Sequence, residues 1–309
     1  MNRYSSIVIA IFSILLAGCP GSKSSTDVVQ LKLNLEKGKS YVYNTSTHFD
    51  MNMNKMATGV DLAYTFKLSL DSKDSAGNQI LDSKIDALKF KADVMGMSMG
   101  YDSKEVIDTN HQDAFSGMFR KMFSGMLGKN FKITIGPTGT IENVTGVEEM
   151  VSGMLDGIPG GEEEKAKMKQ QLNQSFNQDQ VKQTFAQAFN FYPDKPVKIG
   201  DSWNKDVDFG VSGIKSTSQI TYKVKDITSS SVILDMKGET KTLTKSAQDT
   251  TGMAPSTNFS GSSTGSMTVD RTTGLITAGD IDLTMKGSID MKGNKMPMDM
   301  KGKITFGNK

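Results

Sequence analysis

The sequence contains a single cysteine, Cys19, and two histidines, His48 and His111, among its 309 residues. Apart from Cys19 there is no thiol for a disulfide, a thiolate nucleophile or a cysteine metal site. The two histidines lack the paired spacing of metal ligands, so we expect neither a metal site nor a bound cofactor. The 36 basic and 34 acidic residues are interspersed, which predicts no nucleic-acid partner. The fold must therefore be stabilised by a packed core.

The N-terminus has a short basic segment ending at Arg3, then the apolar run Ile7 to Leu16, which is too short to span a bilayer. Leu16, Ala17 and Gly18 precede Cys19. This pattern resembles the lipobox of bacterial lipoproteins. The resemblance implies removal of a signal peptide, residues 1–18, attachment of diacylglycerol to the Cys19 sulfur and acylation of the new amine. Several acyl chains on one residue give stable membrane anchoring.

The segment 19–27 is polar and poor in apolar residues, which predicts a flexible tether. Residues 28–309 then form one β-rich domain, in which we expect N-terminal strands over 28–110, a helical zone over 112–190 that contains a strand at 131–135, and C-terminal strands over 195–306. The expected fold class is α+β: a large curved antiparallel sheet with a central helical insertion packed on its concave face.

Strands are predicted where apolar and polar residues alternate. This alternation occurs from Val29 to Leu35 and from Leu62 to Leu70. Near the C-terminus it continues from Ile281 to Phe306, interrupted at Gly293 and Asn294. We expect a long hairpin there, with methionines on one face and charged residues on the other. Pro297 cannot donate a ladder hydrogen bond, which predicts a sheet edge or a bulge.

The central zone changes to a helical period. Its first helix carries an apolar stripe ending at Gly128, made of Phe115, Met118, Phe119, Met122, Phe123, Met126 and Leu127. Thr145 and Glu148 have capping-box spacing for a second helix, and further helices are expected after Glu162 and Asn177. The stripe fits either packing on the sheet or a movable lid, for which Gly117 and Gly125 would provide flexibility.

Two sequence echoes raise the possibility that the sheet is duplicated. Gly38 to Tyr41 resembles Gly200 to Trp203, and Phe131 to Ile141 resembles Met267 to Ile276 through a shared Thr-Gly turn. Turn chemistry alone could produce both echoes. The segment Ser246 to Ser266 is rich in serine, threonine and glycine, which predicts a long exposed loop.

No catalytic constellation is present, and we expect no enzyme. Gly96 to Gly100 and Gly261 to Gly265 match the G-x-S-x-G pattern, but neither follows a strand and precedes a helix as the nucleophile elbow requires. Gly38 to Ser40 resembles the end of a P-loop, but Leu33 stands where its first glycine belongs.

The 21 methionines are unusually many. Three clusters have alternate spacing: Met51 to Met56, Met95 to Met99, and Met296 to Met300. On a strand such spacing places the side chains on one face, where methionine fills a core or lines an apolar cavity. Thioethers at this spacing also bind Cu(I), although the histidines that usually accompany them are missing here.

This order of strands and helices behind a lipobox resembles uncharacterised bacterial lipoproteins and, more remotely, half-barrel lipoprotein carriers of the Lol type. The resemblance implies a non-enzymatic, membrane-anchored envelope lipoprotein that binds an apolar ligand such as lipid between its sheet and a helical lid. The predicted lining is Phe115, Met118, Phe119, Met122, Phe123, Met126, Met298 and Met300. The alternative is a surface or periplasmic scaffold with a filled core that binds an envelope protein partner.

Overall fold

The computed structural model describes residues 27–307, with gaps at 55, 95–96, 106–113, 157, 159, 212–213, 243–255 and 292–293. This part of the chain is α+β, as predicted, and consists mainly of one antiparallel sheet. The strands are β1 (Ser40–Met53), β2 (Met56–Lys73), β3 (Gln79–Val94), β4 (Met97–Asp102), β5 (Asn130–Ile135), β6 (Ile141–Thr145), β7 (Ser202–Val211), β8 (Ile214–Ile227), β9 (Ser231–Thr242), β10 (Ser256–Asp270), β11 (Ile276–Met291) and β12 (Asn294–Gly307). The helices are α1 (Ala114–Met126), α2 (Val147–Asp156), α3 (Glu162–Ser175) and α4 (Gln178–Phe189).

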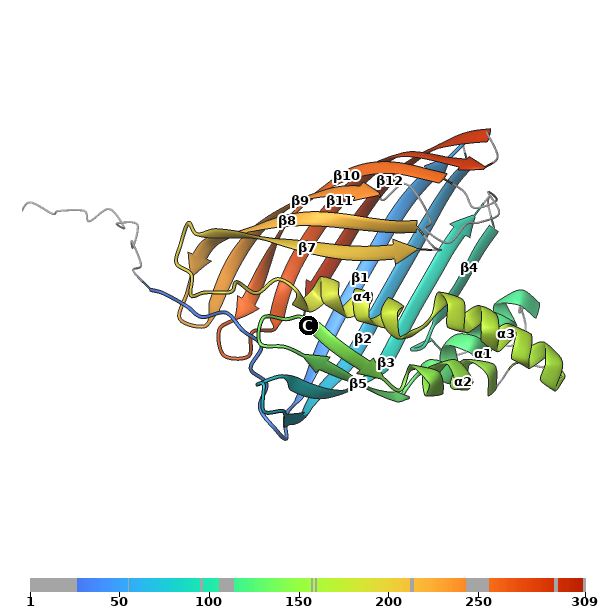
Figure 1. The fold of residues 1–309 in the computed structure, drawn as a ribbon. Helices are drawn as coiled ribbons and strands as arrows, with labels where there is room; N and C mark the ends of the chain where they lie inside the picture. Colours follow the sequence, from blue (N-terminus) through green and yellow to red (C-terminus); the bar gives the residue numbers. More distant parts are fainter. Residues whose placement is uncertain are drawn as a thin grey trace, which may run out of the picture.

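The sheet runs from β6 at one edge to β7 at the other, in the order β6-β5-β3-β2-β1-β12-β11-β10-β9-β8-β7, with β4 paired to β3 alone. Pairing of β1 with β12 joins the two halves of the sheet and brings the first and last strands side by side (Figure 1). Antiparallel neighbours explain the clear alternation along the strands, since one sheet face packs inside and the other faces water.

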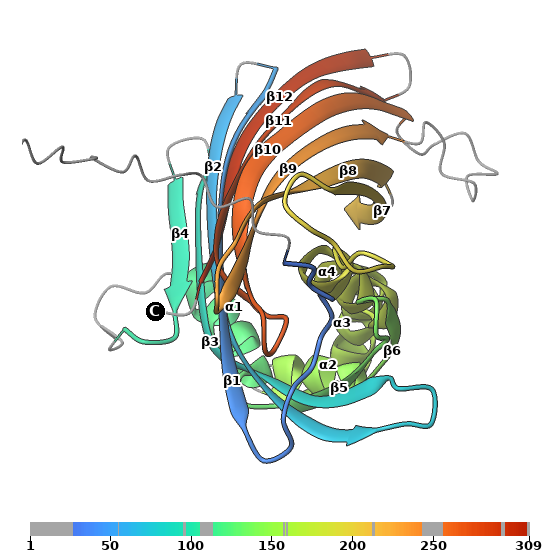
Figure 2. The same cartoon turned by 90° about the vertical axis from the view of Figure 1, so that its left-hand side faces the viewer.

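The sheet curves into an arch, and helix α4 lies between its two edges (Figure 2). The Lys182 side chain donates to the Glu142 carbonyl of β6 at 3.1 Å. At the other end of α4, the side-chain Nδ2 of Asn190 donates to the Asp206 carbonyl of β7 at 3.3 Å. A helix therefore covers backbone groups at both edges, which protects them from pairing with another chain.

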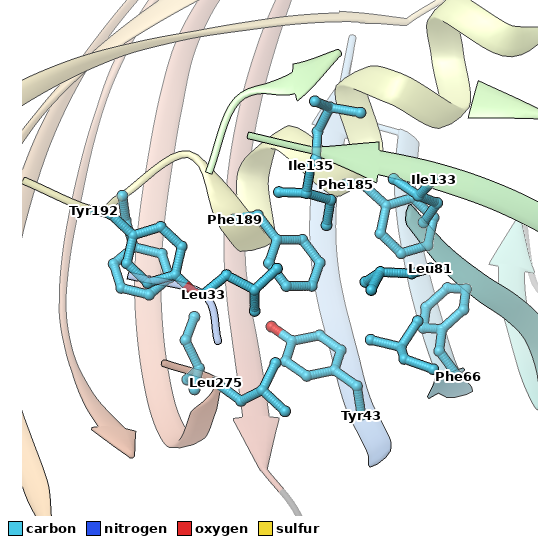
Figure 3. Packing of buried hydrophobic residues seen from close by; sticks show 14 of the residues in the cluster. Leu33, Tyr43, Phe66, Leu81, Ile133, Ile135, Phe185, Phe189, Tyr192 and Leu275 are labelled. Carbon is cyan, nitrogen blue, oxygen red and sulfur yellow. The ribbon is translucent and has the colours of Figure 1, made fainter. Parts of the chain in front are cut away.

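The core lies at the base of the arch, where α4 packs against the concave face (Figure 3). The Phe185 ring lies 5.2 Å from Phe66 of β2 and 5.7 Å from Phe131 of β5, and Phe189 lies 6.3 Å from Tyr43 of β1. Edge-on and offset ring pairs of this kind add about 0.5–1.5 kcal/mol each to the gain from burial. The predicted helical zone thus packs on the concave face, as expected.

The segment 28–35 alternates buried and exposed residues as predicted, but it does not pair as a strand of the sheet. Val29, Leu31, Leu33 and Leu35 are buried in turn, but the segment forms only an isolated bridge, from Val29 to Val197. The buried Gln79 side chain replaces a sheet partner: it donates to the Leu33 carbonyl at 2.6 Å and accepts from the Leu35 amide at 2.8 Å. An extended segment therefore packs inside the arch without joining the sheet.

Ser256 to Ser266 form part of strand β10, so the predicted loop is wrong for this segment, while residues 246–255 lie outside the described residues. Here β10 pairs with both β9 and β11, and small residues are required. A Cβ on Gly265 would lie 2.2 Å from the Asp280 carbonyl oxygen of β11. Tertiary crowding, rather than loop formation, accounts for this glycine.

Pro297 lies in β12, an interior strand, and not at a sheet edge as one alternative predicted. Its carbonyl accepts from the amide of Asn54, the residue just after β1 ends, at 3.1 Å. A residue in an antiparallel ladder directs its N–H and C=O to the same neighbouring strand. The side of Pro297 that lacks an N–H therefore faces β1 just beyond its last paired residue, where no ladder hydrogen bond is lost. Thr145 is the last residue of β6, and α2 begins only at Val147. Thr145 is therefore not the residue that caps α2, and the predicted capping box is wrong.

The two sequence echoes are turns that need positive φ. Gly38 and Gly200 have φ of 84° and 91° and precede β1 and β7, and Gly139 and Gly274 have φ of 84° and 77° in the Thr-Gly turns. Glycine adopts this region without the steric cost that other residues meet. Conformational demand thus accounts for the shared glycines.

Candidate functional site

The inner face of the sheet is defined by Tyr43, whose ring lies 6.3 Å from Phe189 of α4. Side chains alternate along a strand, so Phe49, Met51 and Met53 of β1 point to the same inner face. Met51 is eight residues beyond Tyr43, a distance of about 27 Å along an extended strand. Figure 1 shows these strands continuing well past α4. The inner face therefore extends beyond the core that the helix covers.

Strand pairing gathers methionines on this extension. Met300 of β12 is paired with Met51 of β1 on one side and with Met285 of β11 on the other. In the next row, Met298 is paired with Met53. We call the apolar inner residues of this region the methionine face: Phe49, Met51, Met53, Val60, Leu283, Met285, Ile289, Met298 and Met300.

Every residue of the methionine face is half-buried, whereas side chains of the core are buried. The predicted C-terminal hairpin with one apolar and one charged face is confirmed, because Asp299, Lys301 and Lys303 alternate with the methionines and are exposed. Among the residues described, the helices pack mainly on β4, β5, β6 and β7, and not on this part of β1, β11 and β12. It is an apolar concave surface within reach of solvent.

The other side of the arch, at the level of Met285 and Met300, is polar. Ser218 of β8 pairs with Thr240 of β9, which pairs with Gly261 of β10 and so continues the row to Met285. Ser218 and Thr240 are 8% and 7% exposed, and their hydroxyl oxygens lie 2.5 Å apart. One row of the concave face thus changes from hydroxyl groups on β8 and β9 to thioethers on β11, β12 and β1.

The predicted lining residues divide into two groups. Met298 and Met300 lie on the methionine face, whereas the helical members belong to α1, which packs against β4 and α2. Met126 is buried, Met122 is half-buried, and the half-buried Phe123 ring lies 5.7 Å from Phe90 and 5.9 Å from Tyr101. Phe123 therefore packs on β3 and β4, whereas Met298 and Met300 lie on β12. Strands β2 and β1 lie between β3 and β12, which places β3 about 14 Å from β12 across the sheet.

Phe115, Met118 and Phe119 lie in helix α1, and their side chains are outside the described residues. Gly125 has a packing role rather than the predicted role in flexibility. A Cβ on Gly125 would lie 1.9 Å from the Gly153 carbonyl oxygen of α2, so the two helices cross in close contact there. Small residues permit such a close approach of two backbones.

The outer face carries a charged cluster at the same end of the sheet. The His48 Nδ1 atom lies 2.7 Å from Asp61 Oδ1, and its Nε2 atom lies 3.3 Å from Asp50 Oδ2. The hydrogen bond to Asp61, with a smaller effect from Asp50, raises the pKa of His48. A pocket of about 620 Å³ lies nearby, lined by Asp50, Met51, Asn52, Ala57, Thr58, Gly59, Asp93, Asp299 and Lys301.

A second pocket, of about 420 Å³, lies where α2, α3 and α4 meet, and its lining includes Glu148, Phe176 and Gln178. The side-chain Nε2 of Gln178 donates to Glu148 Oε1 at 3.0 Å in this pocket. Neither pocket is lined by any of the eight residues predicted to line the ligand cavity, although Met51 of the methionine face lines the larger pocket. The two G-x-S-x-G serines, Ser98 and Ser263, lie inside strands β4 and β10, where no nucleophile elbow can form.

The fold defines a protein of the α+β class built on one large, curved antiparallel sheet. The chain belongs to a family of unknown function, DUF6263, whose profile matches residues 76–276. No curated protein matches the chain. In the described residues, no helix combines the length and apolar character needed to cross a membrane.

Among solved structures, the chain is weakly similar to OccK5 (OpdH) of Pseudomonas aeruginosa, with 7% identity and a TM-score of 0.20 over 88% of this chain and 98% of that one. A mutant of the Rh. blastica porin gives 7% identity and 0.20 over 87% and 100%. A loop-deletion mutant of OmpT from Vibrio cholerae gives 9% identity and 0.18 over 88% and 100%. TM-scores of this size do not establish a shared fold.

Proposed function

We propose that this protein is a non-enzymatic envelope lipoprotein, anchored through lipidated Cys19, that binds an apolar ligand such as a lipid chain on the methionine face. The observation that carries the proposal is the continuous half-buried apolar surface on the concave side of β1, β2, β11 and β12. Soluble proteins seldom leave large apolar surfaces in contact with water unless those surfaces bind something.

The composition of the face supports a flexible hydrocarbon ligand. Methionine is unbranched and polarisable, so it adapts to apolar ligands of variable shape. The hydroxyl groups of Ser218 and Thr240 lie at the other end of the same row and suit the polar end of a lipid. A chain lying across the strands would therefore contact thioethers along its length and hydroxyl groups near its head.

The test uses the full mature chain with Cys19→Ser, so that no attached lipid competes for the site. Native mass spectrometry would detect co-purified lipid, and titration with an apolar fluorescent probe would give an affinity. Leu283→Glu places a carboxylate on the methionine face and should weaken probe binding at least about 10-fold, because desolvating it costs more than about 1.4 kcal/mol.

Thr284→Glu is the matched control, because the neighbouring residue is exposed on the outer face of the same strand. It should bind the probe like the parent protein, and circular dichroism would confirm that both variants fold. Equal probe affinity in the two variants, together with no bound lipid in the parent, would contradict the proposal.

The scaffold alternative retains one specific observation in its favour. The base of the arch is filled by aromatic packing around Phe185 and Phe189, and the two pockets described above are lined largely by polar residues. If neither probe nor lipid binds, a scaffold that uses the outer face of the sheet to bind an envelope protein becomes the better proposal.

A further inference from the structure

Three methionines stand side by side across three neighbouring strands. Met285 of β11 pairs with Met300 of β12, and Met300 pairs with Met51 of β1. Met298 and Met53, which pair with each other, lie on the same face two residues further along β12 and β1. Cβ atoms of directly opposed residues are about 4.5–5.5 Å apart, and diagonal neighbours about 7–8 Å. Five thioethers therefore lie within one short stretch of the sheet.

These side chains can reach one another. Methionine has three flexible side-chain torsions, and its sulfur lies two bonds beyond Cβ, so sulfurs of paired residues can turn toward a common point. All five residues are half-buried, and their sulfurs are not locked in the core beneath α4. The site would be partly shielded from water while staying open to a small ligand.

The surroundings favour a soft cation of low charge. None of the neighbouring residues on this face of the sheet that follow carries a carboxylate or an imidazole. They are Phe49, Leu283, Thr58, Gly287 and Gly302. Thioethers are neutral, so they cannot offset the cost of desolvating a doubly charged ion. Soft thioether donors select Cu(I) over the harder divalent metals. Among the residues described, no group of three or more His, Cys, Asp or Glu offers a competing site.

We propose that Met51, Met285 and Met300 bind one Cu(I) ion. Met53 and Met298, in the next row of the same face, are close enough for their sulfurs to replace one of these ligands. Asp50 and Asp299 alternate with these methionines along β1 and β12, so they belong to the opposite face of the sheet and are not ligands of the proposed site, although they line the pocket at this end of the sheet together with Met51. The proposal does not rest on the apolar-ligand function, since it needs sulfur atoms rather than apolar area.

The experiment titrates the full mature chain carrying Cys19→Ser, which removes the thiol, with Cu(I) under anaerobic, reducing conditions against a chromophoric Cu(I) chelator. The parent protein should retain one Cu(I) per chain, and X-ray absorption should show sulfur coordination. The triple variant M51L/M285L/M300L should bind Cu(I) at least about 100-fold more weakly, because loss of even an outer-shell partner costs about 10–100-fold.

Leucine preserves the apolar volume of methionine, so the triple variant should fold and bind the apolar probe like the parent protein. This separates the metal proposal from the lipid proposal, because only the former depends on sulfur. The matched control M99L/M168L/M267L replaces three methionines elsewhere in the chain. The copper proposal is overturned if the parent retains no Cu(I), if the face variant retains it unchanged, or if the control variant loses it equally.

Discussion

Two buried tyrosines in the core differ in one hydrogen bond, and this difference predicts opposite effects of the same mutation. Tyr43 and Tyr192 are 4% and 0% exposed. The Tyr192 hydroxyl donates to the Gly274 carbonyl at 2.8 Å, whereas the Tyr43 hydroxyl, seen near Leu33 and Phe189 in Figure 3, has no hydrogen-bond partner in the described structure. Burying a hydroxyl without a partner costs about 1–3 kcal/mol in proteins.

Replacing Tyr43 by phenylalanine removes an unsatisfied group and hardly changes the ring packing, so the free energy of unfolding should rise by about 1 kcal/mol or more. Tyr192→Phe removes a satisfied hydrogen bond and should lower the free energy of unfolding by about 1 kcal/mol. Equilibrium unfolding in guanidinium chloride at pH 7 would measure both, with unchanged slopes showing that the unfolded states are comparable. Shifts in the same direction would refute the reasoning.

The same pair predicts a dependence on alkaline pH. Burial raises the pKa of both phenols above their ordinary value, so both stay protonated in the folded protein while the unfolded chain ionises near pH 10. The folded state then binds more protons than the unfolded state, and stability should fall as the pH rises above 10. Each group contributes a slope of about 1.4 kcal/mol per pH unit. Tyr43→Phe should make the decline less steep.

Three further predictions concern other parts of the chain. Gln79→Met leaves two buried backbone groups unpaired and should destabilise the protein by about 2–5 kcal/mol, whereas the exposed Gln219→Met should be nearly neutral in the same unfolding assay. Cys19→Ser should abolish incorporation of a fatty-acid analogue in metabolic labelling, and persistent label would disprove the anchor. His48→Gln should cost less than about 1 kcal/mol at pH 5 and nothing at pH 9, because the raised pKa of a half-exposed His48 stabilises the fold only while the ring is protonated beside Asp61.

The spacing of apolar residues predicted most strands and helices, because an element that buries one face must repeat apolar residues at its own structural period. The alternation from Leu62 to Leu70 became β2, and the helical stripe ending at Gly128 became α1. Asn177 caps α4 as its position suggested, by accepting from the Gln180 amide at 3.0 Å. The prediction failed at β10, which is rich in serine and glycine. It is an interior strand between β9 and β11, and its neighbours leave no room for a side chain at Gly261 or Gly265.

The candidate site could be predicted only in part. The alternation and the turn at Gly293 and Asn294 indicated that Met285, Met298 and Met300 share one face of a hairpin, but Met51 joins them only through pairing of β1 with β12. No local signal distinguishes a strand that pairs with its sequence neighbour from one that pairs across the whole chain, as β1 does with β12. Helix α1, whose stripe looked equally suited to the site, packs instead near β4, because contact between helix and sheet is decided by shape in three dimensions.

By itself, the sequence determined the period of each element, its turns and its apolar face, because these depend on residues a few positions apart and on water. The pattern around Cys19 that resembles a lipobox also depends only on neighbouring residues. Strand order, the closure of the arch by α4 and the gathering of methionines from opposite ends of the chain were decided only by the tertiary structure. These features depend on which surfaces from distant parts of the chain fit together. The entropic cost of closing a loop rises only slowly with its length, so this cost alone does not select one long-range strand pairing over another.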